Sequence, residues 1–191
     1  MTQKLFCYVD ETGQDTRGKL FIVSVVVTAD ERDELRRLCE IIERETGKNR
    51  VKWSDAAHVR RLAYIQRILA QPTLRGRLHF ALYYDSRDYT SLTVEAITSA
   101  LNATEISDYE ATVLIDALPR SLERAVGLRL RRSGIPAKKV RGVKKDENDA
   151  LVRLADAVCG FVRTALEQRS SMRSLLEQSL DSGVLKDVSQ K

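Results

Sequence analysis

Apolar and polar residues alternate along the chain in blocks that predict a series of strands and helices. Residues 4–9 and 19–28 are rich in aromatic and β-branched side chains and flank a polar segment with two glycines. This pattern predicts a β-hairpin with an elaborated turn. A capping-box sequence at 28–31 precedes apolar residues at helical spacing, so we expect a helix of about four turns that ends near Gly47.

The rest of the chain continues the alternation of helical and strand-like patterns. We expect helices at 55–71, with Ser54 as the N-cap, and at 85–102, 120–132 and 148–169, and strands at 77–84, 109–115 and 138–143. The hairpin predicts antiparallel neighbours and the helical crossovers favour parallel ones, so the sheet should be mixed and the domain α/β. We expect one domain over residues 1–170, followed by a short helix and a tail over 171–191.

Composition narrows the class of protein. The 191 residues carry a formal net charge of +5, and 43% are hydrophobic, which is typical of a globular domain and excludes disorder of the whole chain. The longest apolar run, 20–27, is far shorter than the roughly 20 residues of a membrane-spanning helix. The N-terminus has no signal-peptide pattern, so we expect a cytoplasmic protein that does not contact membranes.

Cysteine and histidine supply no zinc-site pattern. Cys7, Cys39 and Cys159 lie far apart and form no Cys-x-x-Cys pair, which favours small buried side chains over disulfides. His58 and His79 are isolated in the sequence as well. Any metal chemistry must therefore use oxygen ligands.

Five carboxylates stand out by their position. Asp10 and Glu11 end an apolar strand, Asp116 ends another, and Asp156 lies inside an apolar helical stretch, where a charge is costly without compensation. Asp149 precedes Asp156 by two helical turns and projects on nearly the same face. Each also has a structural alternative: a turn for Asp10 and Glu11, a helix cap for Asp116, the helix dipole for Asp149 and a salt bridge for Asp156.

Basic residues gather in one segment that contains no acid between its ends. A solvated surface is the default interpretation of such a run, but the charges repel one another and suit a polyphosphate partner, which favours nucleic acid. Few aromatic residues are interleaved, so base stacking on this segment is not supported. The segment contributes eight candidate substrate-binding residues: Arg129, Arg131, Arg132, Lys138, Lys139, Arg141, Lys144 and Lys145.

Taken in order, four segments resemble a known family. Residues 6–13 (FCYVDETG), 20–23 (LFIV), 113–116 (VLID) and 154–160 (LADAVCG) are similar to motifs of the family called domain of unknown function 3800. The resemblance spans roughly residues 5–163. It implies a ribonuclease-H-like fold, a mixed sheet in a three-layer α/β/α arrangement, and an origin in a bacterium, phage or mobile element.

The resemblance also implies an acidic metal site. Thr12 replaces the family's usual Ser, and Lys52 matches the family's lysine although the Glu often found before it is missing. All-oxygen ligands favour Mg²⁺ or Mn²⁺, and two such ions about 4 Å apart can promote in-line attack on phosphorus. The implied metal ligands are Asp10, Asp116 and Asp156, with contacts by Glu11 and auxiliary Asp149, and Lys52 and the basic segment would contact the phosphates of the substrate.

Two hypotheses from different classes follow. The first is a metal-dependent nuclease or phosphodiester-transfer enzyme that acts on nucleic acid. The alternative is a catalytically inactive nucleic-acid-binding or scaffold subunit of a phage, mobile-element or defence system. A third possibility is an interaction module whose helices at 30–46 and 55–71 bind a protein partner, a copy of itself included. Trp53, the sole tryptophan, is expected to pack in the core rather than to stack on a base.

Overall fold

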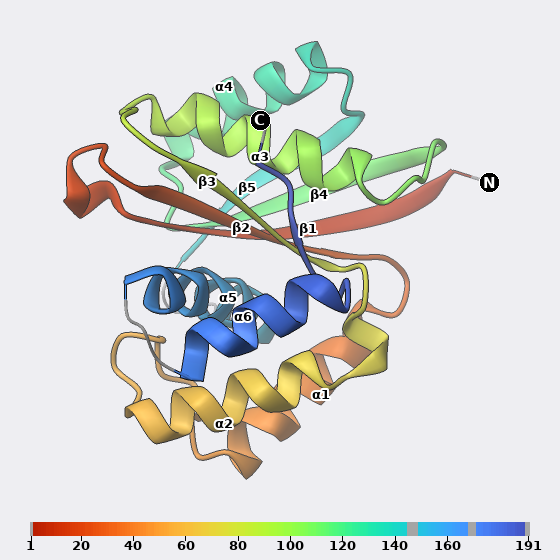
Figure 1. Cartoon of the computed structure of the whole chain (residues 1–191). Helices are drawn as coiled ribbons and strands as arrows, with labels where there is room; N and C mark the ends of the chain where they lie inside the picture. Colours follow the sequence, from red (N-terminus) through yellow and green to blue (C-terminus); the bar gives the residue numbers. More distant parts are fainter. Residues whose placement is uncertain (1, 145–148, 168–170, 190–191) are drawn as a thin grey trace.

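The computed structural model describes residues 2–144, 149–167 and 171–189, and these form one mixed sheet covered by helices on both faces (Figure 1). The strand order is β5-β4-β1-β2-β3-β6. The layered α/β architecture predicted from the alternating pattern is therefore confirmed. The strands are β1 (Gln3–Thr12), β2 (Phe21–Thr28), β3 (Leu78–Tyr83), β4 (Tyr109–Asp116), β5 (Ala137–Val143) and β6 (Leu185–Asp187).

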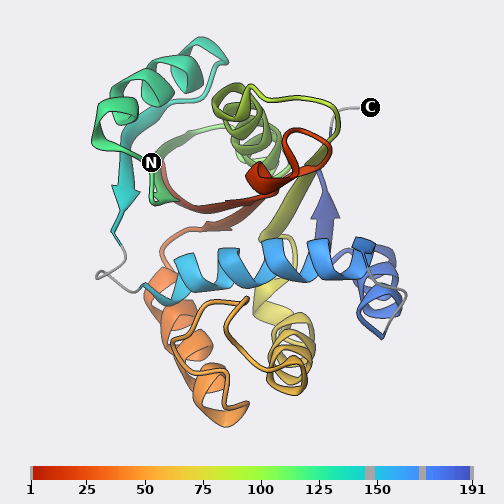
Figure 2. The same ribbon diagram turned by 90° about the vertical axis from the view of Figure 1, so that its left-hand side faces the viewer.

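The helices divide between the two faces of the sheet. Figure 2 looks onto the end of the sheet where the β1–β2 turn lies, with α3 and α4 on one side and α5, α1 and α2 on the other. Because α1 and α2 pack mainly on α5 and α6, they add a layer beyond the three that we expected. The helices are α1 (Arg32–Glu45), α2 (His58–Leu69), α3 (Tyr89–Asn102), α4 (Arg120–Arg132), α5 (Ala150–Glu167) and α6 (Ser171–Asp181), with short 3₁₀ turns at Gln14–Thr16 and Pro72–Leu74.

Strand direction follows the connections between the strands. The β1–β2 hairpin is antiparallel, β4 runs parallel to β1, and β5 runs parallel to β4 after a crossover through the single helix α4. The expectation that helical crossovers give parallel neighbours is wrong for β3, which is antiparallel to β2. Two consecutive helices, α1 and α2, connect β2 to β3, and the second returns the chain to the end of the sheet that it left.

The core is densest where α5 crosses the central strands. All eight residues of β2 are buried because helices cover both faces of that strand. The Ser24 hydroxyl of β2 donates to the Ala155 carbonyl at 2.7 Å, and the Cys159 thiol donates to the Ile22 carbonyl at 3.4 Å. These bonds fix the position of α5 over the end of the sheet. The three cysteines are buried and unpaired, as the sequence predicted.

Two predicted helix starts are wrong. Thr28 does not cap α1, because it is buried at the end of β2, and the Glu31 carboxylate instead accepts a hydrogen bond from the Ala29 amide at 2.8 Å. Ser54 does not cap α2 either, since that helix begins at His58 after Ala57. In both places the segment before the helix makes tertiary contacts, through β2 in the first case and through the Trp53–Asp156 hydrogen bond in the second, and the helix starts later than predicted.

The C-terminal segment has more structure than a short helix and a tail. Helix α6 packs against α5, and β6 pairs in parallel with β3 at the edge of the sheet. The Ser189 hydroxyl accepts a hydrogen bond from the Leu82 amide at 2.8 Å, which covers part of that edge.

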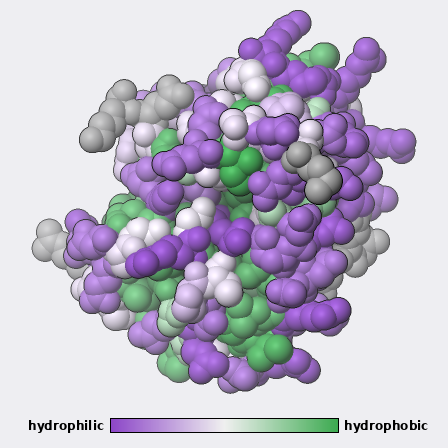
Figure 3. Space-filling model, turned by 90° about the vertical axis from the view of Figure 1, so that its right-hand side faces the viewer, coloured by the Kyte–Doolittle hydropathy of each residue, from purple (hydrophilic) through white to green (hydrophobic). Residues whose placement is uncertain are grey.

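The surface away from the β1–β2 turn is mostly hydrophilic, with apolar side chains in small patches (Figure 3). Such a distribution is typical of a solvent-facing surface. None of the helices in the described residues is long and apolar enough to cross a membrane.

Candidate functional site

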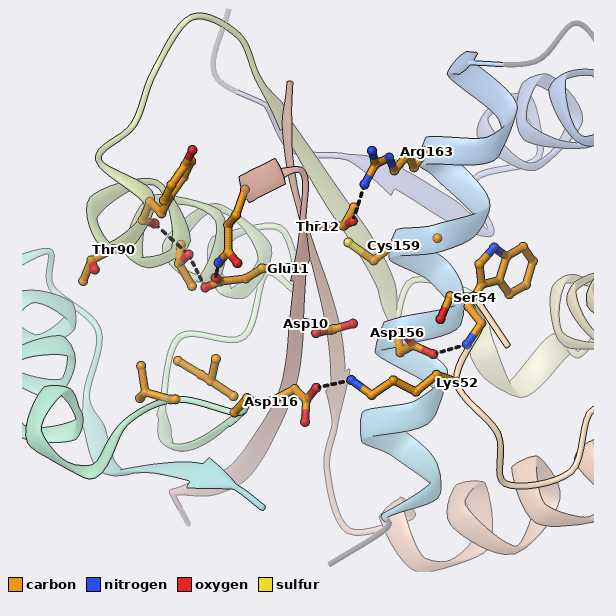
Figure 4. A pocket seen from close by; sticks show the side chains of 18 of the residues that line it. Asp10, Glu11, Thr12, Lys52, Ser54, Thr90, Asp116, Asp156, Cys159 and Arg163 are labelled. Carbon is orange, nitrogen blue, oxygen red and sulfur yellow. Dashed lines mark hydrogen bonds and ion pairs between the residues drawn. The ribbon is translucent and has the colours of Figure 1, made fainter. Parts of the chain in front are cut away.

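Two of the candidate carboxylates meet because their strands are parallel neighbours. Val9 of β1 pairs with Ile115 of β4, and Asp10 and Asp116 are the next residues on their strands. Adjacent positions of paired strands point to the same face of the sheet, which here is the face covered by α5. In Figure 4 both side chains lie between the ends of these strands and α5.

The third carboxylate, Asp156, comes from α5 and is held by the loop before α2. Its Oδ2 accepts a hydrogen bond from the Trp53 backbone amide at 2.7 Å. The indole of Trp53 packs against Gly160, where an added Cβ would lie 2.2 Å from an indole carbon. Glycine is therefore required one helical turn after Asp156, and the spacing of these two residues in the sequence has a packing cause.

Lys52 lies among the three carboxylates. Its ammonium group is 3.2 Å from Asp116 Oδ2, and the side chain is 47% exposed, so the lysine has room to leave this contact. Figure 4 shows Lys52 reaching across from the loop before α2 to Asp116, with Asp10 and Asp156 next to it. Lys52 thus lies beside the acids, and its expected contact with the phosphates of a substrate stays a prediction.

Crowding of like charges sets the electrostatics of the site. Burial, together with the neighbouring charges of Asp156 and Asp116, raises the pKa of Asp10 well above its usual value. Burial also raises the pKa of Asp156, although the Trp53 amide and nearby lysines oppose that shift. Burial lowers the pKa of Lys52, but Asp116 outweighs this effect, so the net shift is upward. The three carboxylates therefore carry more negative charge than Lys52 alone balances.

The chemistry of the donors fits a divalent cation, because Asp10, Asp116 and Asp156 offer oxygen ligands from three elements. They line a cavity of about 700 Å³. As the side chains stand, no three acidic, histidine or cysteine side chains of the described residues are close enough together to hold an ion. Lys52 occupies part of the space at Asp116, so an ion would need Lys52 to move and the carboxylates to close.

Glu11 lies on the opposite face of β1 from Asp10. Its carboxylate accepts hydrogen bonds from the Thr93 hydroxyl of α3 at 2.5 Å and from Gln14 at 3.0 Å. Burial raises the pKa of Glu11, and both hydrogen bonds oppose that shift. Glu11 still lines the same cavity as Asp10, but from the wall formed by α3 (Figure 4).

Asp149 lines a further cavity together with Asp116, Asp156 and Lys52, but its carboxylate is held by other partners. Its Oδ2 lies 3.0 Å from the guanidinium of Arg36 in α1, and its Oδ1 accepts from the Leu151 amide at 2.8 Å, at the start of α5. Seven residues along a helix separate Asp149 from Asp156 by about 10 Å, so the shared helix face alone does not bring the two carboxylates to one ion. Asp149 makes cap and ion-pair contacts here, and its role as an auxiliary metal ligand stays a prediction.

The basic segment divides into two groups. Lys139, Arg141 and Lys144 line a second cavity of about 700 Å³ that shares Lys52 and Asp116 with the first. Four others lie away from both cavities: Arg129 bonds to Ser91, Arg131 to the Ala137 carbonyl, Lys138 to Glu110, and Arg132 is exposed. A register shift at the start of β5 separates the pairing of Ala137 from that of Lys139 and contributes to this division. Lys145 lies outside the described residues.

Two features of the site were not predicted from the sequence. Arg61 of α2 lies with its guanidinium carbon 5.6 Å from the centre of the Trp53 ring and lines the cavity, and nothing in the α2 pattern marks it. Gly142 of β5 lets the loop after Asp116 approach, since an added Cβ would lie 2.0 Å from the Leu118 carbonyl oxygen. Trp53 itself is 4% exposed, so it packs in the core as expected, although its amide also serves the site.

No family model matches the chain, and no curated protein does, so the resemblance to the family called domain of unknown function 3800 stays a prediction. Solved structures do match. Ribonuclease H2 from Pyrococcus horikoshii OT3 is 14% identical, with a TM-score of 0.54 over 94% of this chain and 77% of that chain. A chain in the PCNA:RNase HII complex from Archaeoglobus fulgidus is 15% identical, with a TM-score of 0.49 over 97% and 92%.

At 14% sequence identity, the match to ribonuclease H2 shows a similar fold and nothing about activity. The match covers 94% of this chain and so includes most of its mixed six-stranded sheet and the helices packed on it. The fold expected from the sequence is thus confirmed, and the chain has a ribonuclease-H-like fold.

Proposed function

We propose that this protein is a nuclease, or a related phosphodiester-transfer enzyme, that uses Mg²⁺ or Mn²⁺ and acts on nucleic acid. The observation that carries the proposal is the meeting of Asp10, Asp116 and Asp156, from β1, β4 and α5, at one cavity beside Lys52. Their mutual repulsion is relieved when a divalent cation binds. The fold shared with a ribonuclease H2 supports the same chemistry.

In this proposal the three aspartates hold the metal, and Glu11 orients groups from the opposite wall of the cavity. A bound divalent ion supplies an activated water and stabilises charge on the phosphodiester. Lys52 leaves Asp116 for a phosphate oxygen, which its 47% exposure permits. Lys139, Arg141 and Lys144, in the adjoining cavity, contact phosphates of the substrate without reading its bases.

The test is a cleavage assay. Labelled single-stranded DNA, duplex DNA, RNA and an RNA/DNA hybrid are incubated with the protein and Mg²⁺, Mn²⁺ or a chelator. We expect cleavage that requires metal and is lost in Asp10→Asn and Asp156→Asn, because each variant removes a charged ligand. Asp30→Asn is the matched control, since Asp30 is exposed in the loop after β2. Cleavage that persists in both site variants would contradict the proposal.

One observation favours an alternative without catalysis. The Lys52–Asp116 ion pair already neutralises one carboxylate, and no three acids of the described residues stand at metal-binding distance. A protein that used the acids only for structure would bind nucleic acid through its basic residues. Salt-sensitive binding without cleavage of any substrate, in either metal, would support this alternative over the nuclease.

A further inference from the structure

One basic side chain of the cavity that holds Asp10, Asp116 and Asp156 has no anionic partner among the residues that the structure describes. Three basic side chains line that cavity: Lys52, Arg61 and Arg163. Lys52 pairs with Asp116, and Arg163 pairs with Asp15 at 2.9 Å. For Arg61 the contact seen within the described residues is the face of the Trp53 ring, and its buried Nε has no hydrogen-bond partner.

An arginine in this state is poised to bind an anion. The cation–π contact with the indole restricts the Arg61 side chain and so lowers the entropy that it would lose on binding. A buried N–H without a partner is unfavourable, and an incoming acceptor removes that cost. The planar fork of arginine matches two oxygens of a phosphate group, and arginine stacks on aromatic rings in a way that lysine does not reproduce.

The position of Arg61 relates it to the acids. The Trp53 ring contacts the Arg61 guanidinium, and the Trp53 backbone amide donates a hydrogen bond to Asp156. Lys139 and Lys144 lie in the second cavity, which meets the first at Lys52 and Asp116. Cations therefore line cavities that share Asp116, and Arg61 belongs to the cavity that contains Asp10 and Asp156.

We propose that Arg61, held on Trp53, is a phosphate subsite for the nucleic-acid strand, one that contacts a backbone phosphate other than the one attacked. This inference rests on the proposed function, since it names a further contact with the same substrate. A strand that occupies both cavities would place the scissile phosphate at Asp10, Asp116 and Asp156, with phosphates bound by Arg61 in one cavity and by Lys139 and Lys144 in the other. A single phosphate contact contributes a fixed increment to the salt dependence of binding.

The experiment measures binding rather than cleavage. Fluorescence anisotropy with a labelled single-stranded oligonucleotide and with a duplex, in a chelator, gives Kd at several salt concentrations. We expect Arg61→Gln to weaken binding about tenfold and to reduce the slope of log K against log salt by about 0.7 to 0.9. Arg61→Lys should restore the slope, because the charge returns, but not the full affinity. Arg67→Gln is the control, because Arg67 is exposed on the same helix and pairs with Glu45.

The outcomes separate the subsite from the nuclease. Unchanged affinity and slope in Arg61→Gln, with thermal unfolding like that of the wild type, would overturn the subsite even if Asp10-dependent cleavage is found. A loss in Arg61→Gln that Arg61→Lys partly rescues would support it even if no substrate is cleaved. If Arg61→Gln fails to fold, Arg61→Lys decides: a wild-type slope with weaker binding supports the subsite, and wild-type affinity overturns it. Absence of any oligonucleotide binding by the wild type also overturns it.

Discussion

Two clusters of charged side chains lie on the α5 side of the sheet, and they differ in how their buried charges are compensated. The first is the acid cluster, Asp10, Asp116 and Asp156, with the half-exposed Lys52 as its cation. The second, which we call the buried triad, consists of Glu43, Lys48 and Arg153, all less than a tenth exposed.

Hydrogen bonds hold the buried triad together. Arg153 donates two hydrogen bonds to the Glu43 carboxylate, at 2.7 and 2.6 Å, and the Lys48 ammonium donates to the Val51 carbonyl at 2.9 Å. Lys48 also lies 4.9 Å from the centre of the Tyr64 ring. Because Val51 directly precedes Lys52, the triad positions the loop that serves the acid cluster. A buried carboxylate held by cations on neighbouring elements is typical of structure, whereas an excess of carboxylates at a cavity is typical of a site.

The largest expected effect breaks the buried triad. Glu43→Gln removes the one carboxylate of the triad and so weakens the compensation of the buried Lys48 and Arg153 charges; loss of one partner of such a pair costs about 3–5 kcal/mol of unfolding free energy. Urea unfolding measures it. Glu45→Gln is the control, because Glu45 pairs with Arg67 while both are about half exposed, and it should cost less than about 1 kcal/mol. Equal small losses in the two variants would show that the triad is not a structural unit.

A second prediction concerns a titratable group that is buried away from both clusters. His79 on β3 is fully buried, and burial lowers its pKa from 6.5 to about 4. The unfolded chain therefore binds a proton more readily than the folded one, and stability falls as the pH drops from 6.5 toward 4. The shift corresponds to about 3 kcal/mol in total.

Thermal unfolding between pH 7 and pH 4 measures this loss. His79→Leu should flatten the acid limb of the curve, whereas His58→Gln, at an exposed position, should leave it unchanged. An acid limb that is identical in wild type and His79→Leu would assign it to other groups. Protonation of Asp10 and Asp156 acts in the opposite direction, because their raised pKa values make the folded state more stable as pH falls.

A third prediction tests the excess charge of the acid cluster. Asp10→Asn removes one of three crowded carboxylates, so it should stabilise the metal-free protein by about 1–3 kcal/mol, the cost of an unsatisfied buried group. Urea unfolding in a chelator measures the gain. Asp15→Asn is the contrast, because Asp15 is exposed in an ion pair with Arg163 and should change stability by less than about 1 kcal/mol. A destabilised Asp10→Asn would mean that Asp10 is a structural partner.

The comparison also shows what the sequence could predict. Periodicity found the strands and helices, and the apolar runs that end at Asp10 and Asp116 marked two members of the acid cluster. The buried triad could not be predicted from the sequence, because Glu43 and Lys48 resemble ordinary surface residues. Their partner Arg153 lies on α5, 110 positions after Glu43 in the chain. Local pattern reports which face of an element a residue occupies.

The other differences between the predicted and the observed site arise from contacts with residues that are distant in the sequence. Helical spacing placed Asp149 on the face of Asp156, and the two line one cavity, but the ion pair of Asp149 with Arg36 in α1 could not be predicted from that spacing. The run of basic residues looked uniform, yet only part of it lines a cavity next to Asp116. Arg61 gained its role from the Trp53 ring, which a helical pattern cannot show.

The smallest expected effect addresses the metal directly. Binding to the folded state alone stabilises a protein by RT ln(1 + [L]/Kd), which is about 1.4 kcal/mol at a tenfold excess over Kd. Mg²⁺ or Mn²⁺ should therefore raise the unfolding temperature of the wild type by a few degrees, and Asp10→Asn and Asp116→Asn should respond less. Glu43→Gln, if folded, should keep its response, because the buried triad offers a cation no open ligand. Equal shifts in wild type and Asp10→Asn would place the ion away from the acid cluster and remove the physical reason for its excess charge.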